Sequence, residues 1–175
     1  MTWIRQKLSA CGDRIVCHEA GKAWSYAEFI ELIDQTATQV PSNGGAIIEV
    51  QAPTTIEGLA MLLAIGETGH IALPLPPELP EAEQDKMRLI ANSSQLYNQL
   101  EGSGLVLFSS GTSGEPKGML HNLDALLSRY KNLRARKDRS LLLLLIDHIG
   151  GLDSAFRCLF SGSTLVAVSY THLRA

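Results

Sequence analysis

The chain has 175 residues, of which 45% are hydrophobic, so it is long enough to form one α/β domain with a substantial core. Its 15 basic and 18 acidic residues give a formal net charge of −3, and this balance provides no bulk attraction to nucleic acid or to an anionic membrane. The three cysteines are odd in number and lack Cys-x-x-Cys spacing, which argues against a disulfide framework or a zinc site and favours a reducing compartment.

Two features of the sequence bear on its location. Residues 1–5 lead into no hydrophobic signal core. The longest apolar runs, 59–65 and 141–146, fall far short of the roughly 18 residues that a membrane span needs. We therefore expect a cytoplasmic protein with no transmembrane segment.

The first predicted elements are a helix and a strand. Ser25 and Glu28 have the spacing of a capping box, and the apolar stripe that follows them extends to Val40 at helical spacing. A cluster of proline, serine, asparagine and glycine ends this helix. Residues 46–50 then predict a short strand.

The next segment predicts a buried helix and a strand at the margin of the sheet. Thr54 and Glu57 repeat the capping-box spacing, and residues 59–65 are apolar on all sides, which indicates a buried helix. Residues 70–75 predict a strand, and the prolines in and after it place it at a sheet edge or in a connection. Residues 80–92 predict a polar helix with a proline in its first turn.

The central segment predicts a phosphate-binding loop. Residues 105–108 form a short apolar run that predicts a buried strand, and residues 109–118 follow as a loop rich in glycine and hydroxyl groups that ends in Lys117. Glycine lets the backbone approach an anion, hydroxyls add donors, and lysine adds a full charge. The alternative interpretation is a surface loop without a ligand.

Two common phosphate-binding loops do not match this segment. In the P-loop pattern, Gly111 would need a second glycine where Pro116 stands, and Lys117 would need a serine or threonine where Gly118 stands. The dinucleotide fingerprint also fails, because the nearest glycines precede the strand.

The last segment predicts further alternation of helices and strands. A helix face runs over 123–133, and the apolar run 141–146 predicts a central strand covered on both faces. A helix to about Phe160 and a strand at 164–168 follow. The basic run at the end of the predicted helix over 123–133 is expected at a solvated helix end rather than in a nucleic-acid patch; it comprises Lys131, Arg134, Arg136, Lys137 and Arg139.

Alternating strands and helices predict an α/β fold with a mostly parallel sheet and flanking helices. In such sheets ligands bind at the carboxyl ends of the strands. Both the loop after residue 108 and the turn Asp147–His148 follow a predicted strand, so we expect both at that edge.

Residues 109–118 resemble, at every position, the phosphate-loop signature of the adenylate-forming enzymes, which include acyl-CoA synthetases, luciferases and peptide-synthetase adenylation domains. Residues 24–40 and 47–75 look like the start of the large domain of these enzymes. The resemblance implies that 1–168 are the amino-terminal part of an incomplete AMP-binding domain. Residues 169–175 do not fit the family pattern, and we expect them to derive from a truncated or misjoined reading frame.

The resemblance implies ATP-dependent activation of a carboxylic acid. The carboxylate attacks the α-phosphate of Mg²⁺-bound ATP, pyrophosphate leaves, and the acyl-adenylate is passed to a thiol, usually that of coenzyme A. The longer protein would be an acid-thiol ligase of the acyl-CoA synthetase type, such as those of fatty acid metabolism. The family's magnesium-binding Glu, ribose-binding Asp and adenylation Lys would all lie beyond Ala175, so this chain is expected to be inactive alone.

The resemblance also assigns site residues. The residues implied in nucleotide binding are Ser109, Ser110, Gly111, Thr112, Ser113, Gly114 and Lys117. Lys117 is also the implied catalytic group, which positions the phosphates. His148 and Gly150 are implied to border the carboxylate substrate, with Asp147 where the family commonly has Phe. The plain alternatives are a turn histidine and a solvated lysine, and no residue is predicted to be a metal ligand.

Two other functions stay open from the sequence. One is a peptide-synthetase adenylation module, whose acceptor would be the thiol of an adjoining carrier protein. The other is a non-catalytic anion-binding or nucleotide-binding module that is complete as it stands. Neither interpretation involves nucleic acid.

Overall fold

The structure is a computed structural model that describes residues 2–51, 54–93, 102–110, 116–142 and 145–167. The first half of the chain forms α1 (Thr2–Ser9), β1 (Ile15–Glu19), β2 (Lys22–Ser25), α2 (Tyr26–Ala37), β3 (Ile47–Gln51), α3 (Ile56–Glu67), β4 (Ile71–Leu75) and α4 (Glu81–Ala91). The second half forms β5 (Gly104–Ser110), β6 (Pro116–Asn122), α6 (Leu123–Ser128), β7 (Arg139–Leu142), α7 (Ile149–Ser161) and β8 (Thr164–Ala167). The predicted tail, 169–175, lies outside the described residues.

The strands form two sheets of four strands, in the orders β2-β1-β8-β7 and β3-β4-β5-β6. The pairs β1–β8, β7–β8, β3–β4 and β4–β5 are parallel, and the hairpins β1–β2 and β5–β6 are antiparallel. The predicted α/β fold with mostly parallel pairing is therefore confirmed. The strands are divided between two sheets, whereas a single sheet was expected.

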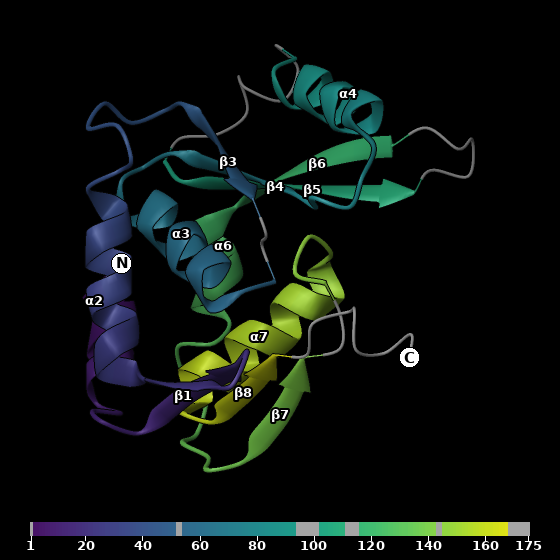
Figure 1. The fold of residues 1–175 in the computed structure, drawn as a ribbon. Helices are drawn as coiled ribbons and strands as arrows, with labels where there is room; N and C mark the ends of the chain where they lie inside the picture. The colour runs from purple at the N-terminus through teal and green to yellow at the C-terminus, as the bar shows by residue number, and fades with distance from the viewer. Residues whose placement is uncertain (1, 52–53, 94–101, 111–115, 143–144, 168–175) are drawn as a thin grey trace, which may run out of the picture.

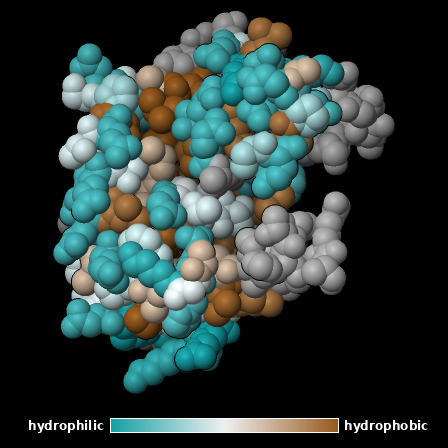
Figure 2. Space-filling view, in the orientation of Figure 1, coloured by the Kyte–Doolittle hydropathy of each residue, from teal (hydrophilic) through white to brown (hydrophobic). Residues whose placement is uncertain are grey.

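Helices pack between the two sheets and over the outer side of one of them. In Figure 1, α3, α6 and α7 lie between the two sheets, and α4 lies over the outer side of the β3–β6 sheet. Side chains along β5 point alternately to opposite faces of the sheet and contribute to two cores. Leu105 and Leu107 belong to the main core, whereas Val106 and Phe108 pack in a smaller core with Met87 of α4. Figure 2 shows that the outward faces of α2 and α4 are largely hydrophilic.

The predicted helix caps agree with the structure to within one residue. At the start of α2, Ser25 Oγ accepts a hydrogen bond from Glu28 N, and Glu28 Oε2 accepts one from Ser25 N, so the capping box is confirmed. At α3 the prediction was wrong by one position, because Thr55 and not Thr54 caps the helix, with Thr55 Oγ1 accepting from Gly58 N. Thr54 Oγ1 instead accepts a hydrogen bond from Ile146 N at 3.2 Å.

The prediction that residues 70–75 form an edge strand was wrong. β4 lies between β3 and β5, and all five of its residues are buried. β3 pairs with all five residues of β4, whereas β5 pairs only with Ile71 and Ala72 of β4. Pro74 therefore lies beyond the β5 ladder, where the loss of its N–H group does not interrupt pairing.

The prediction of a central strand at 141–146 was also wrong. β7 ends at Leu142 and lies at the edge of its sheet, with β8 as its paired neighbour in the described part of the chain. Leu141 is 53% exposed, whereas Leu142 is buried. Cover on both faces is therefore not found at these two residues of β7.

The structure departs from the sequence prediction within and just before the predicted helix at 123–133. α6 begins at Leu123 as expected but ends at Ser128, and the basic run after it is irregular up to β7 rather than a helix end. Before α6, residues 116–122 form β6, a strand that the sequence did not predict.

In the described part of the chain, no helix has the length and apolarity to cross a membrane.

Candidate functional site

The candidate nucleotide site begins at the tip of the β5–β6 hairpin. In the antiparallel register Ser109 of β5 is the partner of Lys117 of β6, and both side chains are exposed. Directly opposed residues in an antiparallel pair project from the same face of the sheet. Ser109 also shares a face with Leu107, so the pair lies on the face of β5 that packs into the main core.

The hairpin places the predicted loop between these two residues. Ser110 ends β5 and Pro116 begins β6, so both ends of the loop are set by strand pairing. The predicted ligands Gly111, Thr112, Ser113 and Gly114 lie outside the described residues, and their roles stay predictions.

Lys117 is one of several cations that have no carboxylate partner in the described part of the chain. Arg5, Arg88 and Arg157 each form an ion pair with a carboxylate. No carboxylate among the described residues pairs with Lys117. The sequence predicted Lys117 at the end of a loop, and the structure places it inside a strand, which limits the directions its side chain can take.

The second part of the candidate site is the turn that leads into α7. His148 N donates to Leu145 O, and Leu152 N donates to His148 O, so His148 is the N-cap of α7. Its side chain makes no capping hydrogen bond and is 64% exposed. Gly150, in the first helical turn, is also exposed. The first-turn N–H groups of α7 therefore lack a side-chain acceptor from the N-cap, and they carry the positive end of the helix dipole.

Asp147 is a candidate site residue whose burial the sequence did not reveal. Its side chain is 10% exposed, and its Oδ1 has no hydrogen-bond partner among the described residues. Burial raises the pKa of Asp147, and the charge of Glu78 adds to this, whereas His148, with Nε2 3.8 Å from Asp147 Oδ2, acts in the opposite direction. Its place beside His148 was evident from the sequence, whereas its burial comes from packing that the local pattern does not contain.

The two parts of the candidate site lie on the same side of the molecule. In Figure 1 the arrows of β5 and β7 both end at the right, where the described chain leads into the loop after β5 and toward α7. The hydrogen bond between Thr54 and Ile146 N ties the turn before α7 to the start of α3. Both parts follow the carboxyl ends of strands as expected, although the strands belong to different sheets.

The described residues include no cluster of side chains that could hold a metal ion by itself. Within residues 2–51, 54–93, 102–110, 116–142 and 145–167, no group of three or more His, Cys, Asp or Glu side chains is placed to hold a metal ion. We therefore assign no step of a reaction to metal-binding residues in this chain.

Comparison of the sequence with known proteins finds relatives of two kinds. No protein-family profile matches the chain. It is 34% identical over 103 residues to a 2-succinylbenzoate-CoA ligase of Bacillus pumilus, an alignment that covers 56% of this chain and 20% of the relative. It is also 22% identical over 174 residues to the hybrid PKS-NRPS synthetase LUC5 of a Fusarium species, covering 73% of this chain and 4% of the relative.

Solved structures share the fold over almost the whole chain. The N-terminal subdomain of NpsA from Klebsiella oxytoca, in complex with 3-hydroxyanthranilyl-AMSN, matches with a TM-score of 0.73 and 17% identity, covering 94% of this chain and 52% of that chain. The O-succinylbenzoate coenzyme A synthetase MenE of Bacillus subtilis, in complex with AMP, matches with a TM-score of 0.69 and 18% identity, covering 98% and 57%. The chain thus spans just over half of these structures and about a fifth of the first relative.

Proposed function

We propose that this chain, whose sequence relatives and structural neighbours are adenylate-forming enzymes, is the amino-terminal part of a ligase that activates a carboxylic acid with ATP. The acyl-adenylate would then pass to a thiol, and we propose coenzyme A as the acceptor. One observation carries the proposal: Ser109 and Lys117 face each other across the ends of a hairpin, in a fold that a solved neighbour shows in complex with AMP.

The hairpin is proposed to hold the phosphates of the nucleotide. Bound ATP supplies an electrophilic α-phosphate and a pyrophosphate leaving group. Lys117 offers three N–H donors and a positive charge, and Ser109 offers a hydroxyl on the same face of the sheet. Opposite charges about 4 Å apart at an effective dielectric near 20 attract each other by roughly 4 kcal/mol. The proposed cradle is completed by Ser110, Gly111, Thr112, Ser113 and Gly114.

The start of α7 is proposed to receive the acid. A carboxylate is stabilised by free N–H groups and by the positive end of a helix dipole. His148 leaves that end uncapped by its side chain, and Gly150 has no side chain to block it. The exposed His148 ring is then the group that borders the rest of the acid. The chain's contribution to catalysis is therefore positioning and charge stabilisation.

A hydroxamate assay tests the proposal. Hydroxylamine traps an acyl-adenylate, so ATP-dependent hydroxamate formation is measured with a panel of acids that includes 2-succinylbenzoate, the acid named for the first relative. The assay compares this chain with a polypeptide extended past residue 175 to the length of the relatives. Activity in the extended polypeptide alone supports the proposal. Activity in neither protein contradicts it and favours the non-catalytic anion-binding module.

A second candidate is a peptide-synthetase adenylation module, which the similarity to the hybrid PKS-NRPS synthetase LUC5 favours. The two candidates share the first half-reaction and differ in the acceptor. Consumption of free coenzyme A by the extended polypeptide supports the coenzyme A ligase. Acylation of an adjoining carrier-protein domain, without consumption of coenzyme A, supports the peptide-synthetase module.

A further inference from the structure

A basic hollow of about 340 Å³ lies at the end of the β2-β1-β8-β7 sheet that is opposite to the candidate site. Ile15, Thr164 and Arg139 are the first residues of the parallel strands β1, β8 and β7, and all three line the hollow. The turn before α7 follows the other end of β7. The hollow is therefore separate from the proposed acid and nucleotide positions.

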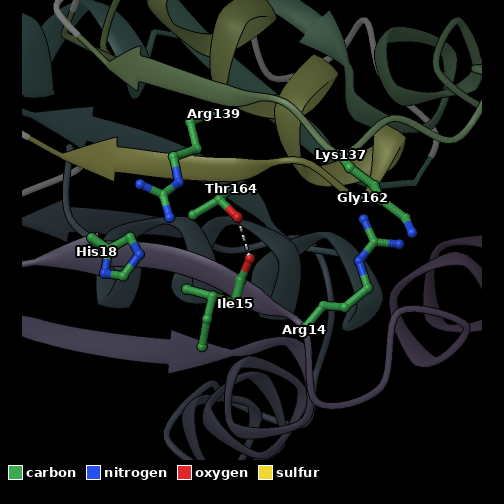
Figure 3. A pocket seen from close by; sticks show the side chains of 7 residues that line it. All are labelled: Arg14, Ile15, His18, Lys137, Arg139, Gly162 and Thr164. Carbon is green, nitrogen blue, oxygen red and sulfur yellow. Dashed lines mark hydrogen bonds between the residues drawn. The ribbon is translucent and has the colours of Figure 1, made fainter.

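The hollow is lined by cations and by no carboxylate. Arg14, Lys137 and Arg139 carry the positive charges, and His18 adds an imidazole ring to the lining. Figure 3 shows Arg139 and His18 at one end of the hollow and Arg14 with Lys137 at the other, with Thr164 between them. None of the three cations forms an ion pair with a carboxylate in the described part of the chain.

One of these cations is held in place by the backbone. Arg14 Nη2 donates to Arg136 O at 3.0 Å, and Arg136 N in turn donates to Ser161 O. Gly162 makes room for the guanidinium, because a Cβ atom at that position would lie 2.7 Å from Arg14 Nη2. Thr164 Oγ1 donates to Ile15 O at 2.7 Å, which leaves the cations and His18 as the donors to a ligand. Arg14 is thus a positioned donor rather than a freely moving side chain.

The arrangement favours a small anion with several charges. Like charges gathered around one hollow repel one another, and an anion between them removes that repulsion. Guanidinium and ammonium groups bind phosphate oxygens through charge-assisted hydrogen bonds. The volume is at the lower end of ligand cavities, which span about 300–1,000 Å³. Apart from His18 no aromatic ring lines the hollow, so a nucleoside base finds little surface on which to stack.

We propose that the hollow between Arg14, Lys137 and Arg139 is a second anion site, which binds a small phosphate-bearing anion of the size and charge of inorganic pyrophosphate. The proposal rests on the residues at this end of the β2-β1-β8-β7 sheet and does not depend on the proposed ligase reaction.

Calorimetric titration with pyrophosphate tests the site. All measurements use the Lys117→Ala background in 0.15 M NaCl, so that binding at the hairpin does not contribute and weak screened attraction is suppressed. The double variant Lys137→Gln/Arg139→Gln is expected to bind at least tenfold more weakly, because two charged hydrogen bonds are lost. Both side chains are exposed, and circular dichroism checks that the fold is kept. Arg134→Gln removes an exposed charge of the same segment and is expected to leave the affinity unchanged.

A site-specific measurement separates this hollow from other surfaces. The ring proton resonances of His18 are expected to shift on addition of pyrophosphate and to stay in place in the double variant. AMP is the second probe, since it carries a phosphate on a nucleoside, and it is expected to bind at least tenfold more weakly than pyrophosphate. Equal affinity of the double variant and its parent, or AMP binding as strong as that of pyrophosphate with the same His18 shift, would overturn the proposal. Absence of pyrophosphate binding in the parent would overturn it as well.

Discussion

Lys117 is the described residue on which the proposed chemistry most depends. It faces Ser109 at the tip of the β5–β6 hairpin, and Lys117→Ala removes one full charge and three N–H donors. In the extended polypeptide we expect kcat/KM for ATP to fall by about 10- to 100-fold, because a hydrogen bond to a charged group contributes about 1.5–3 kcal/mol. The KM for the acid is expected to stay close to the wild-type value, since the acid is assigned to the start of α7.

Steady-state pyrophosphate release measures both constants. Lys131→Ala is the matched control, because Lys131 is exposed and lies outside both proposed anion sites. Unchanged kcat/KM for ATP in Lys117→Ala would remove the phosphate role assigned to this residue.

Glu19 makes the stability of the fold depend on pH near neutrality. It ends β1, and its Oε1 accepts from Ile56 N at 3.2 Å at the start of α3. Burial, followed by the charge of Glu57, raises the pKa of Glu19 from 4.5 to about 7, and the hydrogen bond from Ile56 N offsets part of this rise. The folded state then holds its proton more tightly than the unfolded chain. The contribution of protonated Glu19 to the free energy of unfolding is complete below about pH 4.5 and is lost as the pH rises through about 7.

Glu19→Gln removes this titration and keeps an oxygen acceptor for Ile56 N. We expect the variant to gain free energy of unfolding relative to wild type at pH 8, on the order of 1 kcal/mol after discounting for the partial solvation of a half-buried group. The difference is expected to shrink toward pH 5. Urea unfolding at both pH values measures it, with the exposed Glu31→Gln as the control. An equal difference at pH 5 and pH 8 would show that Glu19 does not titrate between them.

At the scale of single elements, the start of α2 is set by its own capping box. Ser25 Oγ lies 3.1 Å from Glu28 N, and Glu28 Oε2 lies 2.7 Å from Ser25 N. We expect Ser25→Ala to lower the free energy of unfolding by about 1 kcal/mol, because a first-turn N–H group loses its acceptor. Ser25→Asp restores an acceptor and is expected to recover most of the loss. Urea midpoints of the two variants measure the effect, and equal midpoints for Ser25→Ala and wild type would contradict it.

The two helix caps show how far local rules reach. Ser25 is the N-cap that stands three residues before Glu28, so the start of α2 was predictable from the capping-box spacing. At α3 two adjacent threonines compete, and both are acceptable caps. The choice of Thr55 leaves Thr54 for Ile146 N, a partner 92 positions away that the local pattern does not contain.

At the scale of the whole molecule, Tyr26 connects the start of α2 to the end of α7. It is fully buried, and its hydroxyl lies 3.0 Å from Leu159 O and 2.8 Å from Ser163 O. We expect Tyr26→Phe to lower the free energy of unfolding by about 1–2 kcal/mol, because buried carbonyl groups lose a donor while the ring still fills its place. Urea unfolding measures the loss, and an unchanged midpoint at constant m-value would contradict the role of this hydroxyl.

The strands show why sheet order was harder to predict than strand position. Apolar runs located β3, β4, β5 and β8 within a residue or two, because burial of a strand leaves a local mark in composition. They misplaced β4 at an edge and β7 at the centre. Edge and centre depend on which distant strand pairs with which, and Pro74 is tolerated only because the β5 ladder stops before it.

The candidate site likewise combines features that the local sequence predicted with features that only the tertiary structure shows. The hydroxyl-rich loop, its terminal lysine and the turn at His148 were predictable, because each is a short pattern of residue types. The pairing of Ser109 with Lys117, the burial of Asp147 and the gathering of Arg14 with Arg139 were not. Each of these joins a residue to a neighbour that only strand register or packing supplies.

By itself the sequence determined the α/β class, the capped helices, the apolar strands and the loop expected to bind phosphate, since these follow from hydrogen bonding and hydrophobic spacing over a few residues. Only the tertiary structure decided that the strands form two sheets with helices between them, and which side chains share a face or a hollow. Those outcomes depend on contacts between segments far apart in the chain, where burial of the common core selects one pairing among many that local patterns allow.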